Sequence, residues 1–248
     1  MSEKKRLNAI YIITYLVIFF ALWSIRGLII LPVYLDQLDG IAFQVADTAI
    51  KLLIWTLPAI ILIKYFQGDM WVNLKGMFTS KPKWSKTNPY MRPKETWFSL
   101  QSSEESPQWS IEDLFILVAI ILLFPLRAFG SLGTFAIHPD FTPVAMIGSV
   151  IFVGITEEVV FRGWLLNASL KKIKLGSAVL LNMVLFTLIH YPFWIYLGYN
   201  FAAFLSGSAA VMLLSVLCSY SFVRTKNIIV PIGLHMIWNL SIALFAGS

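Results

Sequence analysis

The chain has 248 residues, of which 58% are hydrophobic and only 13% are charged. This charged share is about half that of an ordinary globular protein, which excludes a soluble domain and makes lipid part of the solvent. The formal charge of +6 does not indicate a nucleic-acid partner, because the basic residues gather between apolar runs, where they set membrane orientation.

Seven apolar segments are long enough to cross a bilayer, which takes roughly 20 helical residues. The sequence therefore predicts an all-α, polytopic transmembrane helix bundle with about seven spans, within a range of six to eight. Pro192 interrupts the fifth segment, which we expect to be short, tilted or broken. The segments cover residues 8–31, 42–66, 111–136, 142–166, 176–195, 200–223 and 228–246.

The basic residues predict how the chain sits in the membrane. If the N-terminus is cytoplasmic, every basic cluster falls in a cytoplasmic loop, and the alternate loops carry no lysine or arginine. The first apolar run is too long for a signal-peptide core and no small-residue cleavage site follows it, so we interpret it as an uncleaved span. The one long polar segment, residues 67–110, is predicted to be a cytoplasmic loop.

Three ionisable residues lie in the apolar fourth segment: Glu157, Glu158 and Arg162. A charge near the bilayer centre costs about 2.5–3.5 kcal/mol on insertion scales, so such residues usually have a function. Glu158 and Arg162 are four residues apart and share a helix face, while Glu157 is turned about 100° away. The arginine can neutralise one carboxylate and leave the other as a base. The alternative is that all three reach the cytoplasmic headgroups as interfacial charges.

Polar residues also interrupt two later segments. His190 lies one turn after Phe186 on the same face of the fifth segment, and His235 and Asn239 share a face of the seventh. The last two can both donate hydrogen bonds to a developing oxyanion. The alternatives are hydrogen-bonded structure for His190, and metal binding or interhelical contact for the other two. If the fifth helix is broken, these groups and the glutamates can meet in one pocket that opens toward the cytoplasmic leaflet.

Other polar residues have simpler interpretations. Asp47 and Lys51 are four residues apart in the second segment, which predicts a structural ion pair. Arg26 lies late in the first segment, and we expect it to reach the headgroups or to find a carboxylate. Cys218 is the only cysteine, so no intrachain disulfide can form, and it is interpreted as a small buried apolar residue.

The three polar motifs, taken in order, resemble those of the CPBP family of intramembrane proteases, also called the Abi family. This family contains the type II CAAX prenyl endopeptidases and bacteriocin-immunity proteins. The resemblance covers roughly residues 140–246, and the first 110 residues share with the family only their membrane-spanning character. The motifs are Glu157-Glu158-Val159-Val160-Phe161-Arg162, Phe186-Thr187-Leu188-Ile189-His190 and His235-Met236-Ile237-Trp238-Asn239.

The resemblance implies an endopeptidase and a role for each motif residue. Glu157 is expected to be the general base that activates a water, and His190 to orient that water. His235 and Asn239 are expected to stabilise the oxyanion of the tetrahedral intermediate. The supporting residues are expected to be Glu158, Arg162 and Phe186, the last by shaping the pocket. The chain then divides into residues 1–110, with two spans and the loop, and residues 111–248, the catalytic bundle.

The resemblance favours a reaction without a cofactor. Zinc is the alternative, with Glu157, His190 and His235 as its ligands, since two histidines and a glutamate form a common catalytic zinc site. The helical His-Glu-x-x-His signature, however, does not occur.

The expected partners are membrane lipid and a peptide substrate. The basic start and the lysine-rich inner loops suggest a bacterial member in the cytoplasmic membrane. Its substrate is then a membrane-associated or lipidated peptide or protein, in bacteriocin or signal-peptide processing or in self-immunity. The competing hypothesis is a non-catalytic membrane scaffold or immunity protein that binds a partner. An ion transporter would need a polar path to the outer face, which the sequence does not indicate.

Overall fold

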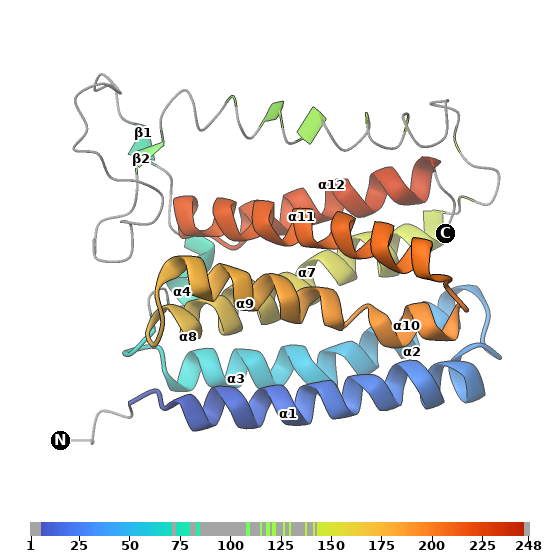
Figure 1. Ribbon diagram of the computed structural model, residues 1–248, viewed down its shortest axis with the longest axis horizontal. Helices are drawn as coiled ribbons and strands as arrows, with labels where there is room; N and C mark the ends of the chain where they lie inside the picture. The colour runs from blue at the N-terminus through green and yellow to red at the C-terminus, as the bar shows by residue number, and fades with distance from the viewer. Residues whose placement is uncertain are drawn as a thin grey trace.

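The computed structural model describes residues 6–70, 73–79, 83–84, 108–109 and 143–245, together with isolated positions between 115 and 141. Long helices lie side by side along one common direction and form a bundle (Figure 1). The predicted all-α membrane bundle is confirmed. Two short strands, β1 (Lys83–Trp84) and β2 (Gln108–Trp109), pair in parallel within the predicted loop, most of which lies outside the described residues.

The first two predicted spans are long helices with π-helical stretches. The first consists of α1 (Ala9–Ile25) and η1 (Arg26–Leu35). The second consists of α2 (Gly40–Lys51), η2 (Leu52–Thr56) and α3 (Leu57–Tyr65).

The fourth predicted span is one helical path that ends four residues later than expected. Its parts are α6 (Pro143–Ala145), η5 (Met146–Phe152), α7 (Val153–Glu158), η6 (Val159–Leu166) and α8 (Asn167–Leu170). The glutamates therefore lie near the middle of this path and not near its end.

The last three predicted spans are also helices. They are α9 (Leu175–Leu188) with α10 (Tyr191–Tyr196), then α11 (Phe201–Thr225), then α12 (Ile229–Phe245). By length and apolar composition, four helices can cross a membrane: Ala9–Leu35, Gly40–Tyr65, Leu175–Tyr196 and Phe201–Thr225. The predicted third span, 111–136, falls largely outside the described residues, so seven spans stay a prediction.

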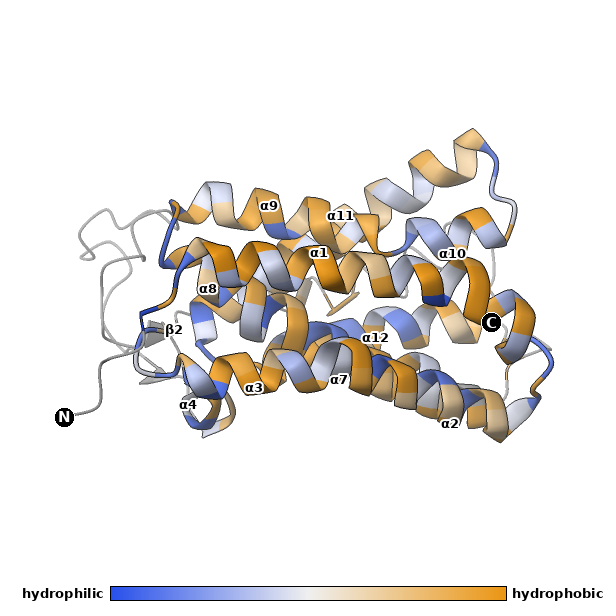
Figure 2. Ribbon diagram, turned by 90° about the horizontal axis from the view of Figure 1, so that it is seen from below, coloured by the Kyte–Doolittle hydropathy of each residue, from blue (hydrophilic) through white to orange (hydrophobic). Residues whose placement is uncertain are grey.

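The outer face of the bundle is apolar. Hydrophobic residues run along the whole length of the long helices (Figure 2). On α1, for example, Ile10, Ile13 and Val17 are each more than half exposed. Side chains of this kind on one continuous surface are suited to lipid and not to water.

Aromatic rings fill the seam between the first two helices. The ring of Trp55 stacks on Trp23 at 4.0 Å and on Phe19 at 5.2 Å between centroids. Tyr15 donates a hydrogen bond to the carbonyl of Trp55 at 3.0 Å. Stacked rings bury a large area at little cost in side-chain entropy, so this seam holds the two N-terminal helices at a defined rotation.

The turn between α11 and α12 lies against the short helix α4 (Leu74–Thr79). Lys226 ends α11 in the left-handed conformation, with φ 50°. Burial lowers the pKa of this lysine. The amide of Ile228 donates to the carbonyl of Met77 at 2.8 Å, which fixes the start of α12 and thereby the rotation of its polar face.

Candidate active site

Glu157 and Glu158 stand at the junction of α7 and η6, inside the bundle. Glu157 is 6% exposed, and Glu158 and Arg162 are fully buried. The π-helical stretches η5 and η6 lie on either side of α7, and π-turns often occur at functional sites. The side-chain amide of Asn182 on α9 donates to the carbonyl of Phe161 at 2.6 Å, which satisfies a carbonyl within η6.

The predicted pair of Glu158 and Arg162 is confirmed. Nη1 of Arg162 lies 3.0 Å from Oε1 of Glu158. Nη2 donates to the carbonyl and to the hydroxyl of Ser215 on α11, at 2.9 and 3.0 Å. The guanidinium carbon also lies 4.6 Å above the ring of Phe186. The arginine is therefore held on three sides. Nothing in the sequence singles out Ser215, because it is one small residue among several on an apolar helix.

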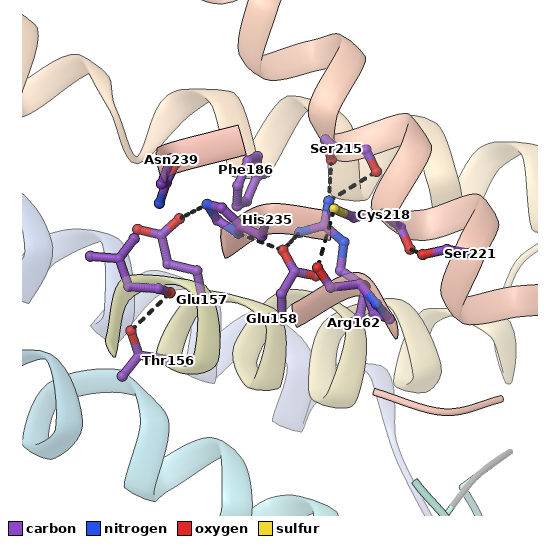
Figure 3. A network of polar contacts seen from close by, with 12 residues as sticks. Thr156, Glu157, Glu158, Arg162, Phe186, Ser215, Cys218, Ser221, His235 and Asn239 are labelled. Atoms are coloured by element: carbon purple, nitrogen blue, oxygen red, sulfur yellow. Dashed lines mark hydrogen bonds and ion pairs between the residues drawn. The ribbon is translucent and has the colours of Figure 1, made fainter. Parts of the chain in front are cut away.

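His235 projects from α12 between the two glutamates (Figure 3). Its Nδ1 lies 2.8 Å from Oε1 of Glu158, and its Nε2 lies 3.9 Å from Oε2 of Glu157. An ionised carboxylate only accepts hydrogen bonds, so Nδ1 carries the hydrogen. In the neutral ring, Nε2 is then left with a lone pair that faces Glu157.

Asn239 follows His235 by one turn of α12. Its amide nitrogen donates to the carbonyl of Ser149 on η5 at 3.0 Å. This bond fixes the orientation of the amide, and the same nitrogen carries a second hydrogen for another acceptor. Ser149 takes part through its backbone, so its side-chain type carries no sequence signal.

The predicted break in the fifth helix is confirmed at His190. Helix α9 ends at Leu188 and α10 begins at Tyr191, with Pro192 in its first turn. Proline has no amide hydrogen to continue the helical ladder, which explains why α9 stops here. Nδ1 of His190 lies 2.9 Å from the carbonyl of Phe186 and must donate to it, which leaves Nε2 as an acceptor.

Phe186 connects the two histidines. Its ring centroid lies 5.3 Å from that of His190 and 5.8 Å from that of His235, in edge-on arrangements. The structure thus brings together all the site residues that the sequence singled out on α7, η6, α9 and α12.

Glu157 differs from Glu158 in its partners. Among the described residues, Oε2 of both glutamates is buried without a hydrogen-bond partner. Glu158 also accepts from Arg162 and His235 through Oε1, whereas Glu157 pairs with Nε2 of His235 at the longer distance of 3.9 Å. A buried polar atom without a partner is costly and marks a place for a water or a substrate group. Because Arg162 neutralises Glu158, Glu157 is the carboxylate with no arginine partner among the described residues.

The residues considered as zinc ligands do not form a metal cluster. In the part of the chain that the structure describes, no group of three His, Cys, Asp or Glu side chains is arranged to hold a metal ion. Zinc is neither supported nor excluded, and the preference for a reaction without a cofactor stays a prediction.

A second buried ionic group lies between the first two helices. The predicted pair of Asp47 and Lys51 is confirmed, with Oδ2 2.8 Å from Nζ. Arg26 joins it: its Nε lies 3.0 Å from Oδ1 of Asp47, and its Nη2 contacts the same oxygen. Of the two expectations for Arg26, the structure supports the one in which it finds a carboxylate. Cys218 is fully buried, as predicted.

The fold and these contacts define an integral membrane protein of the helical-bundle class with a buried acid–base site. Residues 139–241 match the family model described as Type II CAAX prenyl endopeptidase Rce1-like, a match that leaves the first two helices outside. This match agrees with the resemblance to the CPBP family of intramembrane proteases, and the matched family consists of enzymes that hydrolyse peptide bonds. No curated protein and no solved structure matches the chain.

Proposed function

We propose that this chain is an intramembrane endopeptidase in which Glu157 activates a water for attack on a peptide carbonyl. The observation that carries the proposal is the buried Oε2 of Glu157, which has no hydrogen-bond partner among the described residues and faces the Nε2 lone pair of His235 at 3.9 Å. A carboxylate oxygen and an imidazole lone pair are both acceptors. A water that donates one hydrogen to Glu157 fits beside such groups, and its second hydrogen is left for another acceptor.

His190 is assigned the orientation of this water. Its Nδ1 hydrogen is occupied by the Phe186 carbonyl, so its Nε2 lone pair can accept a hydrogen from a water near Glu157. Glu157 then takes one proton as the water oxygen attacks the carbonyl carbon, whose oxygen becomes the oxyanion.

The oxyanion is assigned to His235 and Asn239. The proton taken by Glu157 passes to Nε2 of His235, and the imidazolium is stabilised by Glu158 at its Nδ1. The new Nε2–H and the second amide hydrogen of Asn239 then donate to the oxyanion. When the carbon–nitrogen bond breaks, the proton goes to the leaving amine and the site returns to its first charge state. Each donor of this kind is worth about 10²–10³ in kcat.

Arg162 and Phe186 are assigned supporting roles. Arg162 neutralises Glu158, which keeps that carboxylate an acceptor and so keeps the hydrogen of His235 on Nδ1. Phe186 contacts both histidine rings and limits their rotation.

The substrate is proposed to be a membrane-associated or lipidated peptide, reached from the cytoplasmic side, with the N-terminus in the cytoplasm. The description of the matching family names a prenyl endopeptidase, and the lipid-facing bundle supports a substrate that partitions into the bilayer. Bacteriocin or signal-peptide processing, or self-immunity, fits such a substrate.

The test is cleavage by the purified full chain in lipid vesicles. Internally quenched peptides are offered with and without an S-prenylated cysteine, and Glu157→Gln is compared with wild type. Lys64→Met serves as the control, because Lys64 is exposed on α3. We expect wild type and the control to cleave and Glu157→Gln to lose at least about 10³-fold in kcat. Cleavage that survives both Glu157→Ala and His235→Ala in folded protein refutes the proposal and favours the non-catalytic scaffold.

A further inference from the structure

The break between α9 and α10 leaves the carbonyl of Ile189 in a buried place. Ile189 is the C-cap of α9 and is 2% exposed. The end of a helix leaves carbonyls without an amide from their own helix, and a buried carbonyl needs another donor. Here the donor is Nε1 of Trp23 on α1, which lies 2.7 Å from the Ile189 oxygen. An indole has a single N–H and no acceptor, so this is the one conventional hydrogen bond that the Trp23 side chain can make.

This hydrogen bond acts on the peptide unit that joins Ile189 to His190. A peptide unit is planar, so the Ile189 carbonyl and the His190 amide turn together. The amide of His190 donates to the carbonyl of Thr187 at 3.1 Å, on the other edge of the same plane. Trp23 and Thr187 therefore hold the plane at both edges. A rotation of this plane would change φ of His190, and with it the place of the imidazole.

The indole of Trp23 is itself held in place by its neighbours. Its ring stacks on that of Trp55, with 4.0 Å between centroids and 19° between planes. The guanidinium carbon of Arg26 lies 4.7 Å above the Trp23 ring, and Nε of Arg26 lies 3.0 Å from Oδ1 of Asp47. Stacked and cation–π contacts of this kind restrict the rotation of a buried ring. The first two helices therefore present a fixed donor to the helix break.

We propose that Trp23 is a positioning residue for His190. This rests on the proposed function, in which Nε2 of His190 accepts a hydrogen from the attacking water. The contact between Nδ1 of His190 and the carbonyl of Phe186 fixes the rotation of the ring, and the Trp23 contact fixes the backbone that carries the ring. Trp23 lies outside residues 139–241, which match the family model. The first helix thus completes a site whose other side chains come from the later helices.

Trp55 offers a matched control in the same stack of rings. Trp23 and Trp55 are both buried, with exposures of 5% and 0%. Nε1 of Trp55, however, has no hydrogen-bond partner among the described residues. Trp23→Phe removes the bonded N–H and Trp55→Phe removes the unbonded one, while each variant keeps an aromatic ring in the stack. The comparison therefore separates the hydrogen bond to Ile189 from the loss of ring area.

The first experiment is steady-state cleavage of the quenched peptides in vesicles. We expect Trp23→Phe to lower kcat by about tenfold or more with KM changed less than about twofold, because a displaced His190 affects the chemical step and not binding. Trp55→Phe should stay within about twofold of wild type. Added to His190→Ala, Trp23→Phe should lower kcat by less than about twofold further, since the residue through which it acts is gone. Equal losses in the two Trp variants, a change confined to KM, or a full tenfold loss on top of His190→Ala overturns the proposal.

The second experiment needs no substrate and separates this inference from the proposed function. The chain has three histidines, so the ring C–H signal of His190 in the NMR spectrum of histidine-labelled, detergent-solubilised protein is assigned by its loss in His190→Ala. We expect Trp23→Phe to shift or broaden this signal and Trp55→Phe to leave it in place. An unchanged His190 signal in Trp23→Phe overturns the proposal whether or not a peptide is cleaved. A shifted signal in Trp23→Phe, with no cleavage by wild type, refutes only the proposed function.

Discussion

Nδ1 of His235 and Oε1 of Glu158 lie 2.8 Å apart, although 77 residues separate them in the chain. The same carboxylate oxygen accepts from Arg162 at 3.0 Å, so it is already neutralised and serves as an acceptor for the imidazole. Glu158 therefore decides which nitrogen of His235 holds the hydrogen. The lone pair that faces Glu157 depends on this contact, because it exists only while Nδ1 donates.

Replacement of Glu158 by glutamine should reverse this arrangement. A glutamine amide can donate to Nδ1, which would place the hydrogen on Nε2 and remove the lone pair opposite Glu157, and it also leaves Arg162 without its charge partner. We expect kcat to fall by about 10²-fold or more, with the folded protein retained at lower Tm. Peptide cleavage and thermal unfolding measure the two effects. Activity equal to wild type would show that the tautomer of His235 does not matter.

Ser215 and Ser219, both on α11, allow a matched test of whether the hydrogen bond to Ser215 stabilises the position of Arg162. The Ser215 hydroxyl accepts from Arg162 at 3.0 Å, whereas the buried hydroxyl of Ser219 has no partner among the described residues. Ser215→Ala should lower the free energy of unfolding by about 0.5–1.5 kcal/mol, and Ser219→Ala should be neutral or stabilising. Unfolding in detergent measures both, and equal effects would contradict the role given to Ser215.

Gly27 allows the first helix to approach the helix break. A Cβ at Gly27 would lie 2.7 Å from Cβ of Pro192, whereas a Cβ at Gly68 meets nothing within 4 Å. Gly27→Ala should therefore shift the segment that carries His190, lower Tm by several degrees and reduce kcat, since overpacking costs about 1–3 kcal/mol. Gly68→Ala is the control and should leave both quantities near wild type. A Gly27→Ala variant with normal kcat and Tm would mean that the break tolerates displacement.

Metal dependence can be measured directly on the purified chain. The expectation is that chelator treatment leaves peptide cleavage unchanged and that zinc is below stoichiometric amounts. The measurement is metal content by elemental analysis, with activity before and after chelation. Stoichiometric zinc, with activity lost on chelation and restored by adding zinc back, would assign Glu157, His190 and His235 as ligands instead.

Contacts within one helix could be predicted from the sequence. The pairs Glu158 with Arg162 and Asp47 with Lys51 both follow from the four-residue spacing, which is fixed by the backbone geometry of a helix whatever its surroundings. The break near Pro192 was also predictable, because proline removes a hydrogen bond from any helix.

Contacts between helices could not be predicted in the same way. The sequence predicted His235 as an oxyanion donor, but it did not predict the hydrogen bond of His235 to Glu158. It also did not predict that Ser215 accepts from Arg162, or that Arg26 pairs with Asp47. Each depends on how far one helix is rotated against the next. The π-helical stretches η5 and η6 change that rotation, since every additional residue in a turn moves the following side chains by about 100°.

The sequence by itself determined the solvent of this protein, its helical class and the list of polar residues that a membrane interior makes conspicuous. Composition and periodicity are enough for this, because lipid leaves a backbone few ways to satisfy its hydrogen bonds. Only the tertiary structure decided which of the two glutamates is held by both Arg162 and His235, and that Arg26 joins the pair of Asp47 and Lys51. Those features depend on packing between segments that are far apart in the chain, and the spacing of residues along one helix cannot predict them.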